Sequence, residues 1–266
     1  VFLDVDYDSM GLSPMAVKNF LEEFAELREN GTFNKITNKR IAACLPMHTF
    51  GFPVHLDQLK SVCEKWNIPI VEDSAESLGS LYKGKPTGSF GKTGAFSFNG
   101  NKIITSGGGG MLVTNDEELG QLGKHLTTTA KVSHDYEYIH DAIGYNYRMP
   151  NLNAAMLCAQ LEKLDYFLNN KRNLANEYIT FFEAKHVKFR KELENTKSNY
   201  WLMCVELENR KERDIFLQET NSNNISTRPI WHLICNLPMY QDYYKDDQKN
   251  AKLLSDRIVN IPSSVR

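Results

Sequence analysis

The sequence predicts an α/β protein, with a large domain built on a mostly parallel sheet and a smaller α+β domain after it. Short β-rich runs alternate with amphipathic helical stretches through the first half, and a long helical pattern begins at Pro150. Strand–helix–strand alternation favours a parallel sheet that is covered on both faces. We expect the large domain at residues 1–168 and the small domain at residues 169–266, and the length of 266 residues allows both a substantial core.

Short apolar runs in the first half predict the strands of the large domain, at residues 1–5, 40–46, 68–72, 93–98 and 110–114. Ligands of such sheets bind beyond the carboxyl ends of the strands, where Glu72 and Asp73 fall. The polar segment 28–40 is rich in turn-forming residues and predicts a surface loop or hairpin.

The helices between these strands are predicted from capping residues and apolar spacing. Ser13 and Pro14 suit the N-cap and first position of a helix, and the residues that follow form an apolar stripe: Met15, Val17, Phe20, Leu21 and Phe24. A second helix is expected near residues 56–66. The long pattern after Pro150 predicts a helix that bends near Asn169–Asn170. In the small domain we expect a strand at 200–207 and helices near 210–220 and 248–258.

Composition limits the classes of function. The net charge is −2 and no basic tract is present, so the sequence gives no reason to expect nucleic acid as a partner. No apolar run approaches the length of a membrane span, and the start lacks a signal-peptide pattern. The five cysteines are scattered without a CxxC pair, which indicates neither a disulfide framework nor a zinc site. We therefore expect a cytoplasmic protein without a membrane partner.

The most informative pattern is a lysine that follows a strand-end carboxylate. Lys102 stands in SFNGNKIITSGGGG (97–110), after the acidic strand end IPIVEDSAES (68–77). Pyridoxal phosphate needs a lysine that holds it as a Schiff base and a carboxylate that keeps its pyridine nitrogen protonated. A lone lysine is usually a solvated surface group, but between Lys92 and Asp116 no charged residue other than Lys102 occurs. We therefore predict that Lys102 and Asp73 are catalytic and bind this cofactor.

The residues around Lys102 carry weaker signals. The hydroxyl of Ser97 could donate to a cofactor phosphate, although a serine inside a strand is an equally good interpretation. The glycine run 107–110 suits either close approach to a ligand or a tight turn. It has neither the Walker pattern nor the Rossmann spacing, so it predicts neither nucleotide hydrolysis nor dinucleotide binding.

Three segments together resemble one known family: VEDSAESLGS, GKTGAFSFNGNKIITSGGGGMLVTND and GYNYRMPNLNAAMLCAQL. They resemble the DegT/DnrJ/EryC1/StrS sugar-nucleotide aminotransferases, which are fold-type I pyridoxal-phosphate enzymes. The resemblance extends from Val1 to the C-terminus. It is strongest to the subgroup that makes 4-amino-4,6-dideoxy sugars for bacillosamine- and legionaminic-acid-type glycans. It implies a homodimer in which each subunit contributes to the other's active site.

The resemblance also implies roles for residues around the cofactor. Asp73 matches the partner of the pyridine nitrogen, Lys102 the Schiff-base lysine and Ser97 the phosphate-binding serine. Ala75 would pack beneath the ring. Asn146 matches the region where a neighbouring subunit reaches the cofactor phosphate.

Other matched positions point to the substrate. Glu76 stands where relatives often have Gln or His near the phenolic oxygen of the cofactor, and we expect Glu76 to be protonated or turned toward substrate. His48 matches a common histidine of the family, and a packed core role is at least as good an interpretation. Arg228 and Trp231 match a substrate-proximal segment, in which Cys235 stands where many relatives have His.

The implied reaction moves an amino group from glutamate to C4 of a nucleotide-linked 4-keto-6-deoxy sugar, for surface glycan biosynthesis. Related sugar dehydratases have His in place of the lysine, so the presence of Lys102 favours transamination. A non-catalytic homologue is a third reading, because the Ser–Gly–Thr phosphate loop that family members carry earlier in the chain is absent here. The chain begins at Val1 directly on a strand-like run and ends abruptly, so we expect a fragment of a longer polypeptide.

Overall fold

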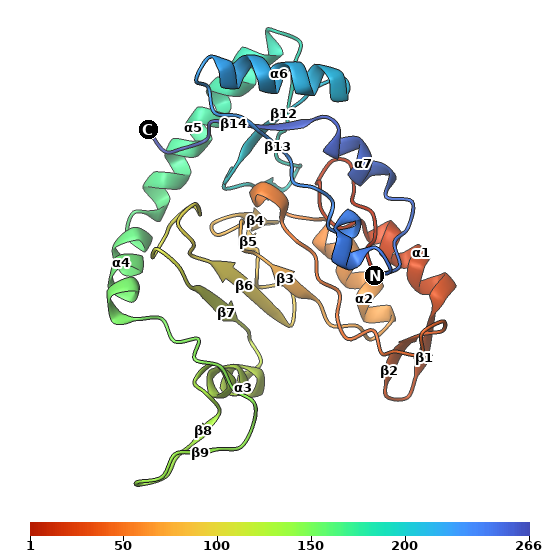
Figure 1. The fold of residues 1–266 in the computed structure, drawn as a ribbon, viewed down its shortest axis with the longest axis vertical. Helices are drawn as coiled ribbons and strands as arrows, with labels where there is room; N and C mark the ends of the chain where they lie inside the picture. Colours follow the sequence, from red (N-terminus) through yellow and green to blue (C-terminus); the bar gives the residue numbers. More distant parts are fainter.

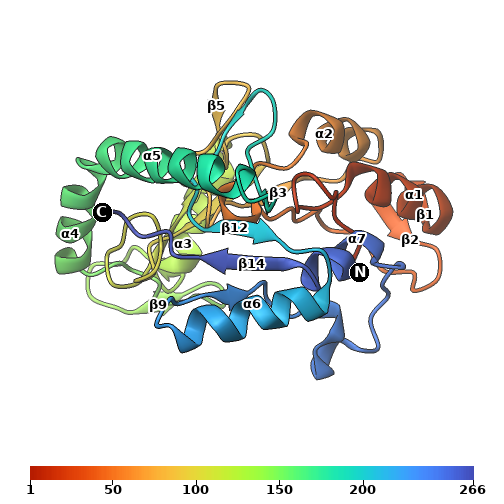
Figure 2. The same cartoon turned by 90° about the horizontal axis from the view of Figure 1, so that it is seen from above.

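The computed structural model describes residues 1–266 and has a mixed α/β architecture (Figures 1 and 2). The sheet beneath the predicted site consists of β3 (Val71–Asp73), β6 (Thr93–Ser97) and β7 (Gly110–Val113). Strands β3 and β6 are parallel, whereas β7 runs antiparallel to β6. The strands predicted near 68–72, 93–98 and 110–114 are thus confirmed, and their sheet is mixed rather than mostly parallel.

The segment predicted as a strand at 40–46 instead forms an interrupted parallel ladder along β3. The amide of Cys44 donates to Pro69 and the amide of His48 donates to Asp73, at 2.9 and 3.1 Å between nitrogen and oxygen. Only single bridges, at Cys44 and Met47, are formed on this side of β3. The reason is Pro46, which has no N–H to donate in the middle of the ladder.

The prediction of a strand at residues 1–5 is wrong. Phe2 and Val5 make only single bridges, to Lys245 and Leu12. Between them, the Asp4 carboxylate accepts hydrogen bonds of 2.8 Å from the amides of Asn250 and Ala251, in the first turn of helix α7 (Lys249–Ser255). A carboxylate at a helix N-terminus satisfies free amides, so this contact, rather than a strand ladder, fixes the segment.

The first two predicted helices are confirmed as α1 (Pro14–Phe24) and α2 (Leu56–Lys65). The Ser13 hydroxyl caps α1 by accepting from the amide of Ala16 at 3.4 Å. The polar segment that follows contributes to a hairpin of β1 (Ala25–Arg28) and β2 (Gly31–Asn34), which confirms the predicted loop or hairpin. A three-stranded sheet joins β11 (Thr196–Lys197), β4 (Leu81–Tyr82) and β5 (Lys85–Pro86).

The long helical pattern forms two helices, α4 (Asn151–Leu161) and α5 (Leu164–Glu183). The break lies at Glu162–Lys163 and not near Asn169–Asn170, because the backbone leaves helical geometry at Lys163, with φ −106° and ψ 5°. Asn170 stays inside α5, where its side chain exchanges two hydrogen bonds with the backbone of Arg266.

The C-terminal part forms an antiparallel sheet in the order β10 (Lys188–Phe189), β12 (Met203–Glu206), β14 (Ile258–Ile261) and β13 (Arg228–Pro229). Helix α6 (Arg210–Ser222) lies beside this sheet, on the side opposite α5 (Figure 2). Helix α3 (Glu117–Thr127) and the hairpin of β8 (Lys131–Val132) and β9 (Ile139–His140) lie at the opposite end of the molecule (Figure 1).

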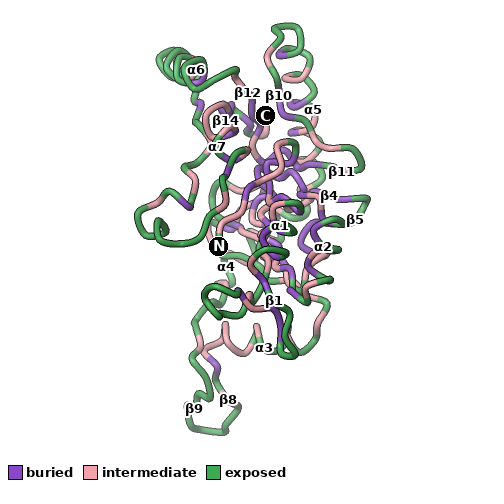
Figure 3. Tube along the Cα trace, turned by 90° about the vertical axis from the view of Figure 1, so that its right-hand side faces the viewer, coloured by how far each residue is buried: buried purple, intermediate pink, exposed green.

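Two hydrophobic clusters hold the fold together, and buried residues concentrate between the sheets (Figure 3). One cluster packs α1 and α2 against Ile68 and Ile70. The other joins Phe50 and Phe52 from the first half to residues of α5, β12 and β14. The predicted domain boundary at residue 168 lies inside α5, and this second cluster contains residues from both sides of it. None of the helices has both the length and the apolar character required to cross a membrane.

Candidate active site

The acidic end of β3 places its two carboxylates in different environments. Glu72 is fully buried and accepts hydrogen bonds from the amides of Gly88, Phe90 and Gly91, at 2.6–2.7 Å. Asp73, the next residue, is only half-buried, and its Oδ1 accepts a bond of 3.1 Å from the amide of Ala75. Of the two acids, Asp73 is therefore the one that can reach a ligand, while Glu72 organises the loop 88–91.

His48 completes the surroundings of Glu72. Its Nε2 lies 3.0 Å from Glu72 Oε2, and its Nδ1 accepts from the amide of Val54 at 3.3 Å. Burial alone would raise the pKa of Glu72, but the hydrogen bonds from His48 and the loop amides outweigh it and lower that pKa. Both ring nitrogens of His48 are used and its side chain is fully buried. The geometry favours the packed core role, and we propose no substrate contact for His48.

Lys102 extends from the loop after β6 toward Glu76. Its Nζ lies 3.8 Å from Glu76 Oε1 and 4.2 Å from the ring centroid of Trp201, and its side chain is only 12% exposed. Glu76 is buried as well, and its Oε2 accepts a 2.8 Å hydrogen bond from the amide of Phe50. The amine of Lys102 is thus enclosed between a carboxyl and an indole.

The electrostatics of this cluster centre on Glu76. Burial raises the pKa of Glu76 to about 7, because its charged form is poorly solvated. The Phe50 amide and the charge of Lys102 oppose this rise, and the nearby charge of Asp73 adds to it. Asp73, Glu76 and Lys102 therefore interact as one group of charges.

Ser97 lies at the same edge of the sheet as Asp73. Asp73 pairs with Ala95 in the parallel β3–β6 ladder, so Ser97 ends β6 just beyond it. The Ser97 Oγ accepts from the amide of Asn99 at 3.3 Å, which leaves its O–H free to donate to a ligand. The glycine run next to it forms a turn, since Gly107 and Gly109 have φ of 81° and 93°, a region that favours glycine.

The other predicted residues lie apart from this cluster. Asn146 is exposed, accepts a 3.0 Å bond from Arg148, and bridges Thr128 near the β8–β9 hairpin. Arg228 and Trp231 line a cavity of about 690 Å³ whose wall also includes Asn101 and Trp201. Because Asn101 directly precedes Lys102, this cavity reaches the lysine loop.

The donor set suits pyridoxal phosphate. A half-buried carboxylate with one hydrogen bond and a serine hydroxyl lie at the carboxyl ends of β3 and β6, and an enclosed lysine amine belongs to the loop that follows β6. These groups are the partners that the aldehyde, the ring nitrogen and the phosphate of this cofactor require.

Sequence reasoning missed Trp201 and Asn199. Both are buried in the segment that leads into β12; Trp201 lies within the strand predicted at 200–207, and Asn199 lies just before it. Nothing in their spacing indicates a site, because they reach Lys102 and Glu76 only through the packing of the second half of the chain on the first.

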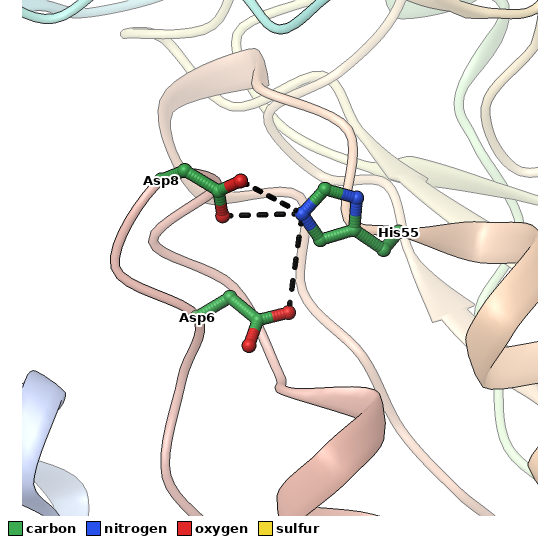
Figure 4. Close-up of side chains that lie close together, drawn as sticks. All are labelled: Asp6, Asp8 and His55. Carbon is green, nitrogen blue, oxygen red and sulfur yellow. Dashed lines mark hydrogen bonds and ion pairs between the residues drawn. The ribbon is translucent and has the colours of Figure 1, made fainter.

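Asp6, Asp8 and His55 form a second group of polar side chains (Figure 4). His55 Nε2 is 3.1 and 3.0 Å from the two Asp8 oxygens and 4.0 Å from Asp6 Oδ2. All three contacts converge on one ring nitrogen, as in a hydrogen-bonded histidine–carboxylate pair. Burial raises the pKa of Asp6. We assign this group no metal.

The whole chain, residues 1–266, matches the profile of the DegT/DnrJ/EryC1/StrS aminotransferase family. The chain belongs to this family. It is 38% identical over 231 residues to the GDP-perosamine synthase of Escherichia coli O157:H7, covering 86% of this chain and 62% of that protein. It is 35% identical over 232 residues to the GDP-perosamine synthase of Vibrio cholerae, covering 85% of this chain and 62% of that protein. The chain thus spans about three fifths of the length of the curated relatives it matches.

Solved structures agree on the fold. A family aminotransferase from Brucella abortus superposes with a TM-score of 0.86 at 24% identity, covering 99% of this chain and 68% of that one. Helicobacter pylori PseC, an aminotransferase involved in the biosynthesis of pseudoaminic acid, superposes with a TM-score of 0.87 at 23% identity, with 99% and 68% covered. These likenesses support the predicted α/β fold.

The raised pKa of Glu76 predicts a measurable effect of pH on stability. Between pH 4.5 and 7 the unfolded chain loses the Glu76 proton while the folded protein keeps it, so wild-type stability falls with pH. Glu76→Gln removes this dependence and can still accept from Phe50. We expect the unfolding free energy of the variant minus that of wild type to increase by about 1–3 kcal/mol from pH 5 to pH 8, because the wild type loses stability over this range.

Urea unfolding at both pH values measures this difference. The same substitution at Glu64, which is exposed, is the matched control and should show little change. A difference between Glu76→Gln and wild type that stays constant across this range would contradict the assigned ionisation.

Proposed function

We propose that this chain carries the catalytic part of a pyridoxal-phosphate-dependent aminotransferase that moves an amino group from glutamate to C4 of a nucleotide-linked 4-keto-6-deoxy sugar. The observation that carries the proposal is the enclosed amine of Lys102 beside Glu76, in the loop that follows β6, with the half-buried Asp73 at the end of the neighbouring strand β3. Family membership and the sugar-aminotransferase names of the relatives support it.

When bound, the cofactor supplies an aldehyde that carries the amino group and a ring that stabilises negative charge on the reacting carbon. Lys102 would hold the aldehyde, and its amine, when free and neutral, would take the proton from the glutamate Cα. Asp73 would keep a proton on the ring nitrogen through its carboxylate. Ser97 would donate to the phosphate, and Ala75 would pack beneath the ring.

The cavity lined by Arg228 and Trp231 is the proposed sugar-nucleotide site. It adjoins Asn101, so a sugar in it lies next to the lysine loop. Trp231 presents an aromatic face to a sugar or base, and Arg228 supplies a cation for a phosphate. The subgroup assignment, to 4-amino-4,6-dideoxy sugars of surface glycans such as bacillosamine and legionaminic acid, is part of the same proposal.

We also propose a homodimer. Large apolar side chains are unusually exposed on and after the β8–β9 hairpin and at the start of α4, namely Tyr136, Tyr138, Ile143, Tyr147 and Leu152, each at least 73% exposed. Such a patch favours burial against another protein surface. These side chains flank Asn146 in the sequence, and Asn146 is the residue proposed to reach the cofactor phosphate of the other subunit. The five free cysteines agree with a cytoplasmic location.

Incubation with ¹⁵N-glutamate and either a GDP-linked or a UDP-linked 4-keto-6-deoxy sugar tests the reaction. We expect one 2-oxoglutarate for each labelled amino sugar, as measured by mass spectrometry. Loss of a sugar hydroxyl without gain of nitrogen would instead identify a dehydratase. A protein that binds no pyridoxal phosphate and transforms neither sugar would be the non-catalytic homologue.

A further inference from the structure

Trp201 touches the predicted catalytic lysine although it comes from the opposite half of the chain. The Lys102 Nζ lies 4.2 Å from the Trp201 ring centroid. The indole Nε1–H donates to the backbone carbonyl of Asn101 at 2.6 Å. One side chain therefore contacts both the amine of Lys102 and the backbone just before it.

The same segment also holds the backbone around Glu76. Asn199 is fully buried, and its Nδ2 donates to the carbonyls of Glu76 and Leu78 at 2.8 and 2.9 Å. Its Oδ1 accepts from the amide of Trp201 at 2.8 Å. Residues 199–201 thus join the Glu76 loop to the Lys102 loop.

A third connection runs through the aromatic rings. Trp201 stacks on Trp231 with ring centroids 6.2 Å apart and an interplanar angle of 24°. The ring centroids of Trp231 and Phe50 are 5.1 Å apart, and the Phe50 amide donates to the Glu76 carboxyl. The indole of Trp201 is therefore in contact on several sides, with Lys102, Asn101 and Trp231.

We propose that Trp201 is a positioning residue that holds the Lys102 amine at the cofactor site, beside Glu76. This inference rests on the proposed function of Lys102. The indole face attracts the ammonium, and the Nε1–H bond restrains the loop that carries it. Holding the amine in place raises the rate at which it attaches to a bound aldehyde, because fewer of its conformers point away.

Two variants separate the contributions of the ring face and the N–H. Trp201→Phe keeps an aromatic face and loses the bond to Asn101, whereas Trp201→Leu loses both. Trp66→Phe is the matched control, because Trp66 packs against the other core and its buried Nε1 makes no hydrogen bond. Thermal unfolding of each variant shows how much of any effect is a loss of folding.

The measurement is the rate of covalent attachment of pyridoxal phosphate to Lys102. Borohydride stops the reaction at timed points, and peptide mass spectrometry locates the cofactor. We expect the rate to fall about 5- to 30-fold in Trp201→Leu and about 2- to 5-fold in Trp201→Phe, while Trp66→Phe stays within about 2-fold of wild type. In the amino-transfer assay we expect kcat to fall in the same order, with the KM for glutamate changed less.

Two results would overturn the proposal. One is an unchanged attachment rate in folded Trp201→Leu, and the other is a rate that falls only in proportion to the folded fraction at the assay temperature. Failure of the proposed function looks different, because borohydride would then fix no cofactor on Lys102 of the wild-type protein.

Discussion

Lys102→Ala is expected to abolish covalent attachment of pyridoxal phosphate and to lower amino transfer by about 10³-fold or more. Lys102 is proposed both to hold the cofactor and to move the proton on the reacting carbon, and loss of a general acid–base alone costs about 10²–10⁴-fold. The amine is enclosed between Glu76 and Trp201, and no other lysine makes an ion pair with Glu76.

Absorbance and borohydride labelling measure attachment, and 2-oxoglutarate release measures transfer. Lys102→Arg keeps the positive charge and should be equally inactive, because a guanidinium does not give up its proton at neutral pH. Lys92→Ala is the control, since Lys92 is exposed and pairs with Asp116 outside the site. Normal labelling and turnover in Lys102→Ala would remove this residue from its assigned role.

The sequence predicted that Asp73 and Ser97 share one edge of the sheet because local rules govern this placement. Parallel strands end at a common edge, and β3 and β6 were both recognisable as apolar runs. A residue at the end of either strand therefore reaches that edge without any knowledge of the remaining fold.

The role of Trp201 could not be predicted in this way. Its contact with Lys102 depends on how the second half of the chain packs against Phe50, and no spacing in the sequence records that packing. Two predictions about the backbone were wrong for similar reasons. Pro46 interrupts a ladder whose partner strand was predicted, and the helix break at Lys163 has no proline or glycine to indicate it. The sequence also does not indicate what the neighbouring Glu72 does, because the loop amides that it binds come from residues 88–91.

Asp73→Asn is expected to lower amino transfer by about 10³-fold while leaving the attachment of pyridoxal phosphate to Lys102 detectable. The Asp73 carboxylate accepts one hydrogen bond from Ala75, and its charge is close enough to act on Glu76. An asparagine keeps the shape and the acceptor oxygen but loses the charge that holds a proton on the ring nitrogen. Electrostatic groups of this kind contribute about 10²–10³-fold each, and here the charge serves both halves of the reaction.

The separation of the two readouts is what makes Asp73→Asn informative. Attachment depends on the Lys102 amine and should persist, whereas removal of the glutamate Cα proton depends on the protonated ring. Single-turnover conversion of glutamate, followed by 2-oxoglutarate release, measures the second step alone. Asp57→Asn is the matched control, because Asp57 is exposed in the first turn of α2 and pairs with Lys83. The activity of the Asp57→Asn variant should equal that of wild type. Equal loss of attachment and turnover in Asp73→Asn would show that this carboxylate supports the fold of the site and not the charge on the ring.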